Sequence, residues 1–132
     1  GLTAYMWTGG YDVPPKTVTR SVRDDMLFLD EVIGAGEIAI SDHRGIDHEP
    51  AELSKLVRDT HVGGMLSKKA GVTHFHVGEE DQRLAILRDL VDTYACRPEW
   101  LYPTHVERSE ALMDEAVALA ASGAHCDVDT VE

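Results

Sequence analysis

Short apolar runs alternate with longer amphipathic stretches along most of the chain. The runs predict strands at residues 2–8, 38–40, 72–77 and 100–102, with one more at 125–128. Between them, apolar side chains recur at helical spacing in four stretches, so we expect one helix in each. This alternation is typical of α/β proteins in which a parallel sheet is built by right-handed crossovers.

Residues that start and stop helices bound the four predicted helices. Gly34 and Gly36 are expected to close the first, Pro50 to open the second, Asp81 to cap the third and Gly123 to end the fourth. The expected buried faces carry Val22, Met26, Leu29 and Ile33; Leu53, Leu56, Val57 and Thr60; Leu84, Leu87, Val91 and Tyr94; and Leu112, Ala116 and Leu119.

Two architectures fit five parallel strands joined by helices. One is an open, doubly wound sheet, and the other is a segment of a (β/α)₈ barrel. A complete barrel needs about 250 residues. Because this chain has 132, it would form only a partial barrel.

The charge balance excludes two classes of partner. Asp and Glu number 24 against 12 Lys and Arg, which gives a net charge of −12. Nucleic acid and anionic membrane surfaces would both repel such a chain. No stretch approaches the roughly 18 apolar residues of a membrane span. The acidity indicates either a solubilising surface or a salty cytoplasm that screens self-repulsion.

The cysteine count indicates the cellular compartment, and the residues at the chain ends indicate whether the chain belongs to a longer polypeptide. Two cysteines, Cys96 and Cys126, are too few for a disulfide scaffold and favour a reducing cytoplasm, although a single bridge stays open. The chain runs into an apolar segment directly after Gly1 and stops soon after another. Because domains more often begin and end in polar linkers, we expect it to belong to a longer polypeptide.

Polar side chains gather where the predicted strands end. Parallel sheets place active sites at the carboxyl ends of their strands. The simpler interpretation is that loops are polar in any protein. The side chains concerned are Tyr11; Asp42, His43 and Arg44; His76; and His105 and Arg108.

Three residues on or next to the predicted strands suggest a metal site. His76 and His105 could converge from adjacent strands, and neutral imidazoles suit zinc, manganese, iron or nickel. Glu37 could add a carboxylate from a neighbouring strand. His74 and His76 share one face of a strand and could chelate, which is a weak signal alone. The alternatives are ordinary hydrogen-bonded histidines and a structural glutamate, and no phosphate loop or Gly-x-Ser-x-Gly elbow is present.

Four segments together resemble the isoaspartyl (β-aspartyl) dipeptidases of the amidohydrolase superfamily, in order and in spacing. They are WTGGYDVP at 7–14, AISDHR at 39–44, GVTHFHVG at 71–78 and PTHVER at 103–108. The resemblance covers essentially the whole chain. It implies that residues 1–132 form a single segment of a (β/α)₈ barrel, spanning about strands three to seven.

The resemblance also implies a role for each site residue. The family hydrolyses small anionic dipeptides with two divalent metal ions, which are zinc. His76 and His105 would bind one ion, and Tyr11 would polarise the scissile carbonyl. Arg44 and Arg108 would hold the substrate carboxylates. Two departures are a glutamate where the family commonly has a bridging carboxylated lysine, at Glu37, and Glu107 in place of an asparagine.

The resemblance also shows what this chain lacks. The family's His-x-His pair of strand one and its catalytic aspartate of strand eight are absent from these residues. We therefore expect the chain alone to be inactive, and its unpaired edge strands to associate with the missing barrel segments or with a second copy. The alternatives are another amidohydrolase activity (deaminase, dihydroorotase-like enzyme or lactonase) and a non-catalytic metal-binding module.

Overall fold

A single parallel sheet organises the chain. The computed structural model describes residues 1–45 and 47–130. The strands β1 (Met6–Thr8), β2 (Val32–Ile40), β3 (Val72–Val77) and β4 (Leu101–Thr104) lie in the order β1-β2-β3-β4. Every neighbouring pair is parallel. A doubly wound sheet would reverse its strand order partway, so this consecutive order favours the barrel segment.

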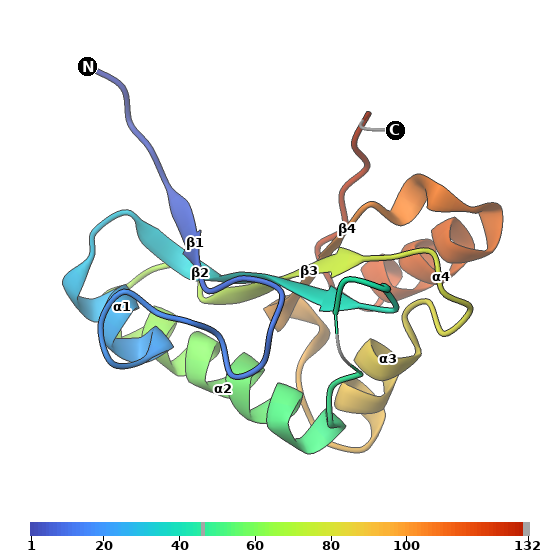
Figure 1. Ribbon diagram of the computed structural model, residues 1–132, viewed down its shortest axis with the longest axis horizontal. Helices are drawn as coiled ribbons and strands as arrows, with labels where there is room; N and C mark the ends of the chain where they lie inside the picture. The colour runs from blue at the N-terminus through green and yellow to red at the C-terminus, as the bar shows by residue number, and fades with distance from the viewer. Residues whose placement is uncertain (46, 131–132) are drawn as a thin grey trace.

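A helix follows each strand. The helices are α1 (Val22–Phe28), α2 (Pro50–Ser67), α3 (Ala85–Asp92) and α4 (Glu110–Ala121), with two short 3₁₀ turns at Pro98–Trp100 and Val106–Arg108. Figure 1 shows α1, α2 and α3 on the same side of the sheet. The core fills the space between the sheet and these helices, and its largest fully buried side chains include Phe75, Met26, Ile38, Leu53, Leu87 and Leu101.

Much of the predicted pattern is confirmed. Helix α2 begins at Pro50, and its predicted apolar positions and Thr60 are buried. Strand β3 has the predicted bounds, 72–77. Helix α4 buries the three predicted positions and ends just before Gly123.

The predicted end of the first helix was wrong. Helix α1 ends at Phe28, and β2 begins at Val32, so Gly34 and Gly36 lie inside a strand. A Cβ on Gly34 would collide with the carbonyl oxygen of Val72 and lie 2.7 Å from the Trp7 ring. These glycines therefore allow close approach between strands, which periodicity alone does not distinguish from a helix stop.

Two further predictions were wrong in detail. Asp81 does not cap α3, because the helix starts four residues later, where the Leu84 amide donates to Glu115 (3.1 Å). Residues 125–128 form no assigned strand, yet they run beside β4. The amide of His125 donates to Leu101 O (3.0 Å) and that of Asp127 to Pro103 O (3.3 Å).

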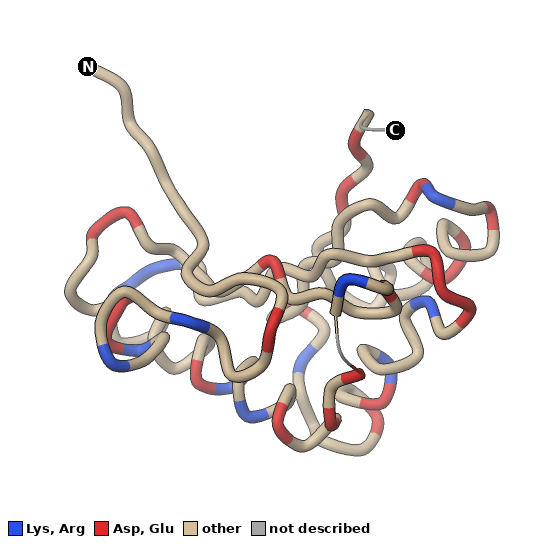
Figure 2. The backbone as a smooth tube through the Cα atoms, in the orientation of Figure 1, with Lys and Arg blue, Asp and Glu red and all other residues tan. Residues whose placement is uncertain are grey.

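Acidic side chains are spread over the surface, and the two cysteines are not bridged. Figure 2 shows Asp and Glu spread over the helices and loops instead of collected on one face. Cys96 and Cys126 are both free thiols, so the bridge that the sequence left open is not formed. Within 1–45 and 47–130, no helix is long and apolar enough to cross a membrane.

Candidate metal and substrate site

Three predicted metal ligands meet at the carboxyl ends of the strands. Glu37 comes from β2, His76 from β3, and His105 directly follows β4. Nδ1 of His76 lies 3.0 Å from Oε2 of Glu37, and Nε2 of His105 lies 3.8 Å from the same oxygen. One candidate ligand atom from each residue lies within 4.8 Å of the other two. Two imidazoles and a carboxylate form a donor set that suits zinc and neighbouring divalent ions.

His74, which the sequence left as a weak candidate to chelate metal with His76, makes other contacts. Nδ1 of His74 is 2.9 Å from the Tyr102 carbonyl oxygen, and its ring stacks on Trp7 with centroids 5.0 Å apart. Its Nε2 remains 3.7 Å from Oε1 of Glu37. Burial lowers the pKa of His74 below its ordinary value, which favours the neutral ring.

A carboxylate contacts the outward nitrogen of each candidate ligand histidine. Nε2 of His76 lies 3.0 Å from Oδ2 of Asp42, and Nδ1 of His105 pairs with Asp129. Metal-binding histidines in proteins almost always have such a partner, because it fixes the tautomer and the ring orientation. The inward-facing atoms, together with these outer partners, fit a divalent metal ion.

The end of β2 positions Arg44. Its Nε and Nη2 donate to the two oxygens of Asp42 at 2.9 and 2.8 Å, and Nη2 lies 2.9 Å from Nε2 of His76. The Asp42 side chain is 1% exposed. The hydrogen bond from Arg44 outweighs burial and holds the pKa of Asp42 well below its usual range. Asp42 is therefore an anion at the junction of Arg44 and His76.

Arg108 and Tyr11 lie at the same end of the strands. Arg108 closes a 3₁₀ turn after β4, and its Nη1 lies 3.3 Å from the exposed carboxylate of Glu79. Among residues 1–45 and 47–130, the buried Nε of Arg108 has no hydrogen-bond partner. Tyr11 is exposed in the loop after β1, with its ring centroid 5.1 Å from that of His76. The structure thus places His76 and His105 beside Glu37, and Tyr11 and Arg44 beside His76. Arg108 lies on the turn after His105.

Sequence reasoning missed the outer carboxylates. Asp42 was noted at a strand end without a role, and Asp129 was assigned no role. Residues His105, Glu107 and Asp129 also form a second group whose candidate ligand atoms lie within 4.8 Å of one another. Position at a strand end could have pointed to Asp42. Nothing in the local sequence indicates Asp129, which reaches His105 from 24 residues away.

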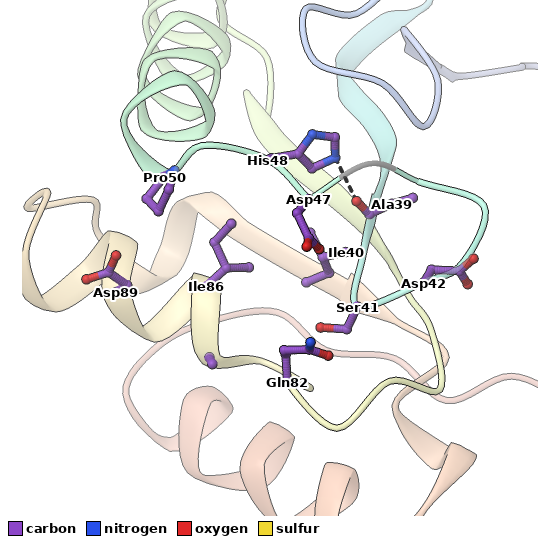
Figure 3. Close-up of a pocket in the computed structure, with 11 residues that line it drawn as sticks. Ala39, Ile40, Ser41, Asp42, Asp47, His48, Pro50, Gln82, Ile86 and Asp89 are labelled. Carbon is purple, nitrogen blue, oxygen red and sulfur yellow. Dashed lines mark hydrogen bonds between the residues drawn. The ribbon is translucent and has the colours of Figure 1, made fainter.

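A neighbouring pocket is separate from the ligand set. It lies between the end of β2 and the start of α3, and Figure 3 shows His48 bonded to the Ala39 carbonyl at its upper edge. The hydrogen bond is 2.8 Å long. Asp42 stands at the margin, with its carboxylate directed away from the other lining residues (Figure 3). That orientation leaves the carboxylate to Arg44 and His76.

Comparison with known proteins identifies the relatives of this arrangement. No family model matches the chain. The crystal structure of a β-aspartyl dipeptidase from the thermophilic, keratin-degrading Fervidobacterium islandicum, in complex with β-Asp-Leu dipeptide, matches with a TM-score of 0.94 and 40% sequence identity. A second structure of that enzyme has a TM-score of 0.95 at the same identity. Each match covers 100% of this chain and 36% of the enzyme. The resemblance seen in the sequence is confirmed: along its whole length this chain is similar to part of a β-aspartyl dipeptidase and forms a partial barrel like that part.

Proposed function

We propose that residues 1–132 are a single segment of a metal-dependent β-aspartyl dipeptidase and carry one part of its active site. The observation that supports this is the convergence of Glu37, His76 and His105 beside Tyr11 and Arg44. The whole-chain similarity to an enzyme crystallised with β-Asp-Leu points to the same substrate class.

The proposed metal site uses the inward-facing atoms. Nδ1 of His76, Nε2 of His105 and the Glu37 carboxylate would hold metal in a site that takes two divalent ions in the complete enzyme. We propose zinc, which prefers nitrogen and carboxylate ligands of this kind. When bound, such ions polarise a substrate carbonyl and lower the pKa of a coordinated water.

Tyr11 would stabilise charge that develops on the substrate. Its exposed ring beside His76 can present the phenolic hydroxyl to the scissile carbonyl. A hydroxyl that donates to the developing oxyanion stabilises the transition state more than the ground state. We therefore assign Tyr11 to the chemical step rather than to substrate affinity.

The two arginines would bind the carboxylates of the dipeptide. A planar guanidinium can donate two parallel hydrogen bonds to a carboxylate. Asp42 already holds Arg44 in this way. Glu79, the partner of Arg108, is 82% exposed, so this ion pair is weak and a substrate carboxylate can replace it.

We also propose a cytoplasmic location, and association of this segment with further barrel strands or a second copy. The free thiols of Cys96 and Cys126 are stable in a reducing compartment. Strand β1 lies at one edge of the sheet, preceded by exposed apolar side chains at Leu2 and Tyr5. An apolar edge of this kind is normally covered.

The test uses the full-length protein loaded with zinc and assayed with β-Asp-Leu. His76→Ala should lower kcat/KM by more than about 100-fold, since loss of even an outer partner of a metal ligand costs 10–100-fold. His125→Ala, a substitution of an exposed histidine, should leave turnover unchanged. Absence of β-Asp-Leu hydrolysis by the zinc-loaded wild type would contradict the proposal.

The isolated 132-residue chain tests the claim that it is one part of the site. It should bind zinc weakly and hydrolyse nothing, because two imidazoles and one carboxylate make an incomplete centre. Robust turnover by the isolated chain, abolished by His76→Ala, would show that these residues suffice.

A further inference from the structure

We propose that Asp42 is a positioning residue that holds the metal-binding His76 and the substrate-binding Arg44 through one buried carboxylate. The inference rests on the proposed function, which assigns those two roles. It predicts that Asp42, although it touches neither metal nor substrate, affects the affinity for both.

The geometry of Asp42 is fixed from several directions. Oδ1 accepts from the backbone amide of Arg44 at 2.7 Å and from its Nε at 2.9 Å. Oδ2 accepts from Nη2 of Arg44 at 2.8 Å and lies 3.0 Å from Nε2 of His76. The backbone is equally confined, because a Cβ on Gly78 would lie 2.5 Å from the Asp42 Cα. A side chain held in this way can orient its neighbours.

Asp42 determines which ring nitrogen of His76 has a lone pair free to bind a metal ion. A neutral imidazole carries one proton. If Nε2 carries it, that nitrogen donates to Asp42 and the Nδ1 lone pair faces Glu37, 3.0 Å away. If Nδ1 carries it, Nε2 accepts from Arg44 instead and the inward nitrogen is blocked. A metal ion on Nδ1 would leave the proton on Nε2, where the Asp42 carboxylate accepts it in a charge-assisted hydrogen bond.

Asp42 also sets the plane of the Arg44 guanidinium. Its two oxygens engage Nε and Nη2 of that group, which fixes the direction in which Nη1 points. A preorganised guanidinium loses less side-chain entropy when it binds a substrate carboxylate. The carboxylate of Asp42 that orients His76 therefore also orients the guanidinium of Arg44 for binding a substrate carboxylate.

The experiment compares Asp42→Asn with Asp59→Asn in the full-length protein. Asp59 forms another arginine–carboxylate pair, with Arg23 at 2.8 Å, on the exposed side of α2. Zinc alone is titrated into the metal-free proteins by calorimetry, and KM and kcat are measured with β-Asp-Leu. Asp42→Asn should weaken zinc binding by about 10–100-fold and raise KM by about tenfold or more. Asp59→Asn should change neither.

A third variant separates the two roles. Arg44→Ala should raise KM without weakening zinc binding, because His76 keeps its carboxylate partner. If Asp42→Asn behaves like Arg44→Ala, with zinc affinity intact, the proposed link to His76 is wrong. If Asp42→Asn leaves KM unchanged, the proposed link to Arg44 is wrong.

A measurement on the wild type keeps the test independent of whether Asp42→Asn folds. Long-range ¹H–¹⁵N NMR of the zinc-loaded protein should find the His76 proton on Nε2, and a proton on Nδ1 would overturn the inference. Zinc binding without β-Asp-Leu hydrolysis would refute the proposed function, while zinc affinity and the NMR spectrum would still judge Asp42. Failure of the wild type to bind zinc would refute both.

Discussion

At the scale of single residues, the predicted ligands have clear sequence signals, Asp42 has a weaker one and Asp129 has none. Glu37, His76 and His105 interrupt or follow apolar strands, so their positions at one edge of the sheet follow from the pattern. Asp129 meets His105 only because the chain returns beside β4 after a helix. Such a contact depends on tertiary packing, which no local pattern records.

Arg108 allows a prediction about substrate binding. Arg108→Ala should raise KM for β-Asp-Leu by about 10–100-fold, since hydrogen bonds to a charged group are worth about 1.5–3 kcal/mol. Steady-state kinetics of the full-length protein would measure this. Glu79→Gln is the matched variant, because it removes the carboxylate that now competes for Arg108. It should leave KM unchanged or lower it, and a higher KM would show that the pair supports binding.

At the scale of elements, glycine has two uses that hydrophobic periodicity does not distinguish. It ends helices, and it lets neighbouring strands approach closely. The order of the four helices and of the first four strands was predicted correctly, because apolar runs and helical faces alternate clearly. The end of α1 was misplaced, since glycines close helices in many proteins but here let β2 approach its neighbours. A glycine required by contacts across strands looks the same in the sequence as one that ends a helix.

Gly34 tests this interpretation. Gly34→Ala should destabilise the full-length protein by about 2–4 kcal/mol, because a Cβ would overlap Val72 and the Trp7 ring. Urea unfolding followed by circular dichroism would measure the loss. Gly10→Ala is the control, since a Cβ there would meet nothing within 4 Å. Equal stability of the two variants would mean that the strands can separate at little cost.

Asp25 ties α1 to the loop before it and to β1. Its buried carboxylate accepts hydrogen bonds from the hydroxyls of Thr8 and Thr19 and from the amides of Val18 and Thr19. Burial alone would raise the pKa of Asp25, but these bonds outweigh it and lower that pKa. The group therefore stabilises the fold above its unfolded pKa, about 3.9, and loses this contribution as pH falls through the folded value.

The Asp25→Asn variant isolates that contribution. At pH 7 it should be less stable than the wild type by about 2 kcal/mol or more, given several hydrogen bonds to one charge. The difference should persist down to about pH 5 and shrink below about pH 4, because the unfolded carboxyl then takes up its proton first. Urea midpoints across this range would measure it. A difference that grows as the pH falls would contradict the assigned direction.

At the scale of the whole molecule, the fold is similar to one part of a larger barrel enzyme. The chain spans 36% of the enzyme it matches, and its sheet ends at β1 on one side and beside β4 on the other. Residues 125–127 already add hydrogen bonds along β4. This edge is therefore partly covered within the chain, whereas β1 presents its outer side together with exposed Leu2, Tyr5 and Met6.

This asymmetry predicts how the isolated 132-residue chain associates. Unpaired strand edges recruit other strands, so we expect oligomers through β1 in small-angle scattering or light scattering. The net charge of −12 opposes this self-association, and screening by salt reduces that repulsion. Oligomer content should therefore rise between low and physiological ionic strength.

Two substitutions at the β1 edge, Tyr5→Lys and Met6→Lys, should suppress association, since charged residues protect edges. Val117→Lys, on an exposed face of α4, should not. A monodisperse monomer at every salt concentration would show that the β1 edge needs no cover.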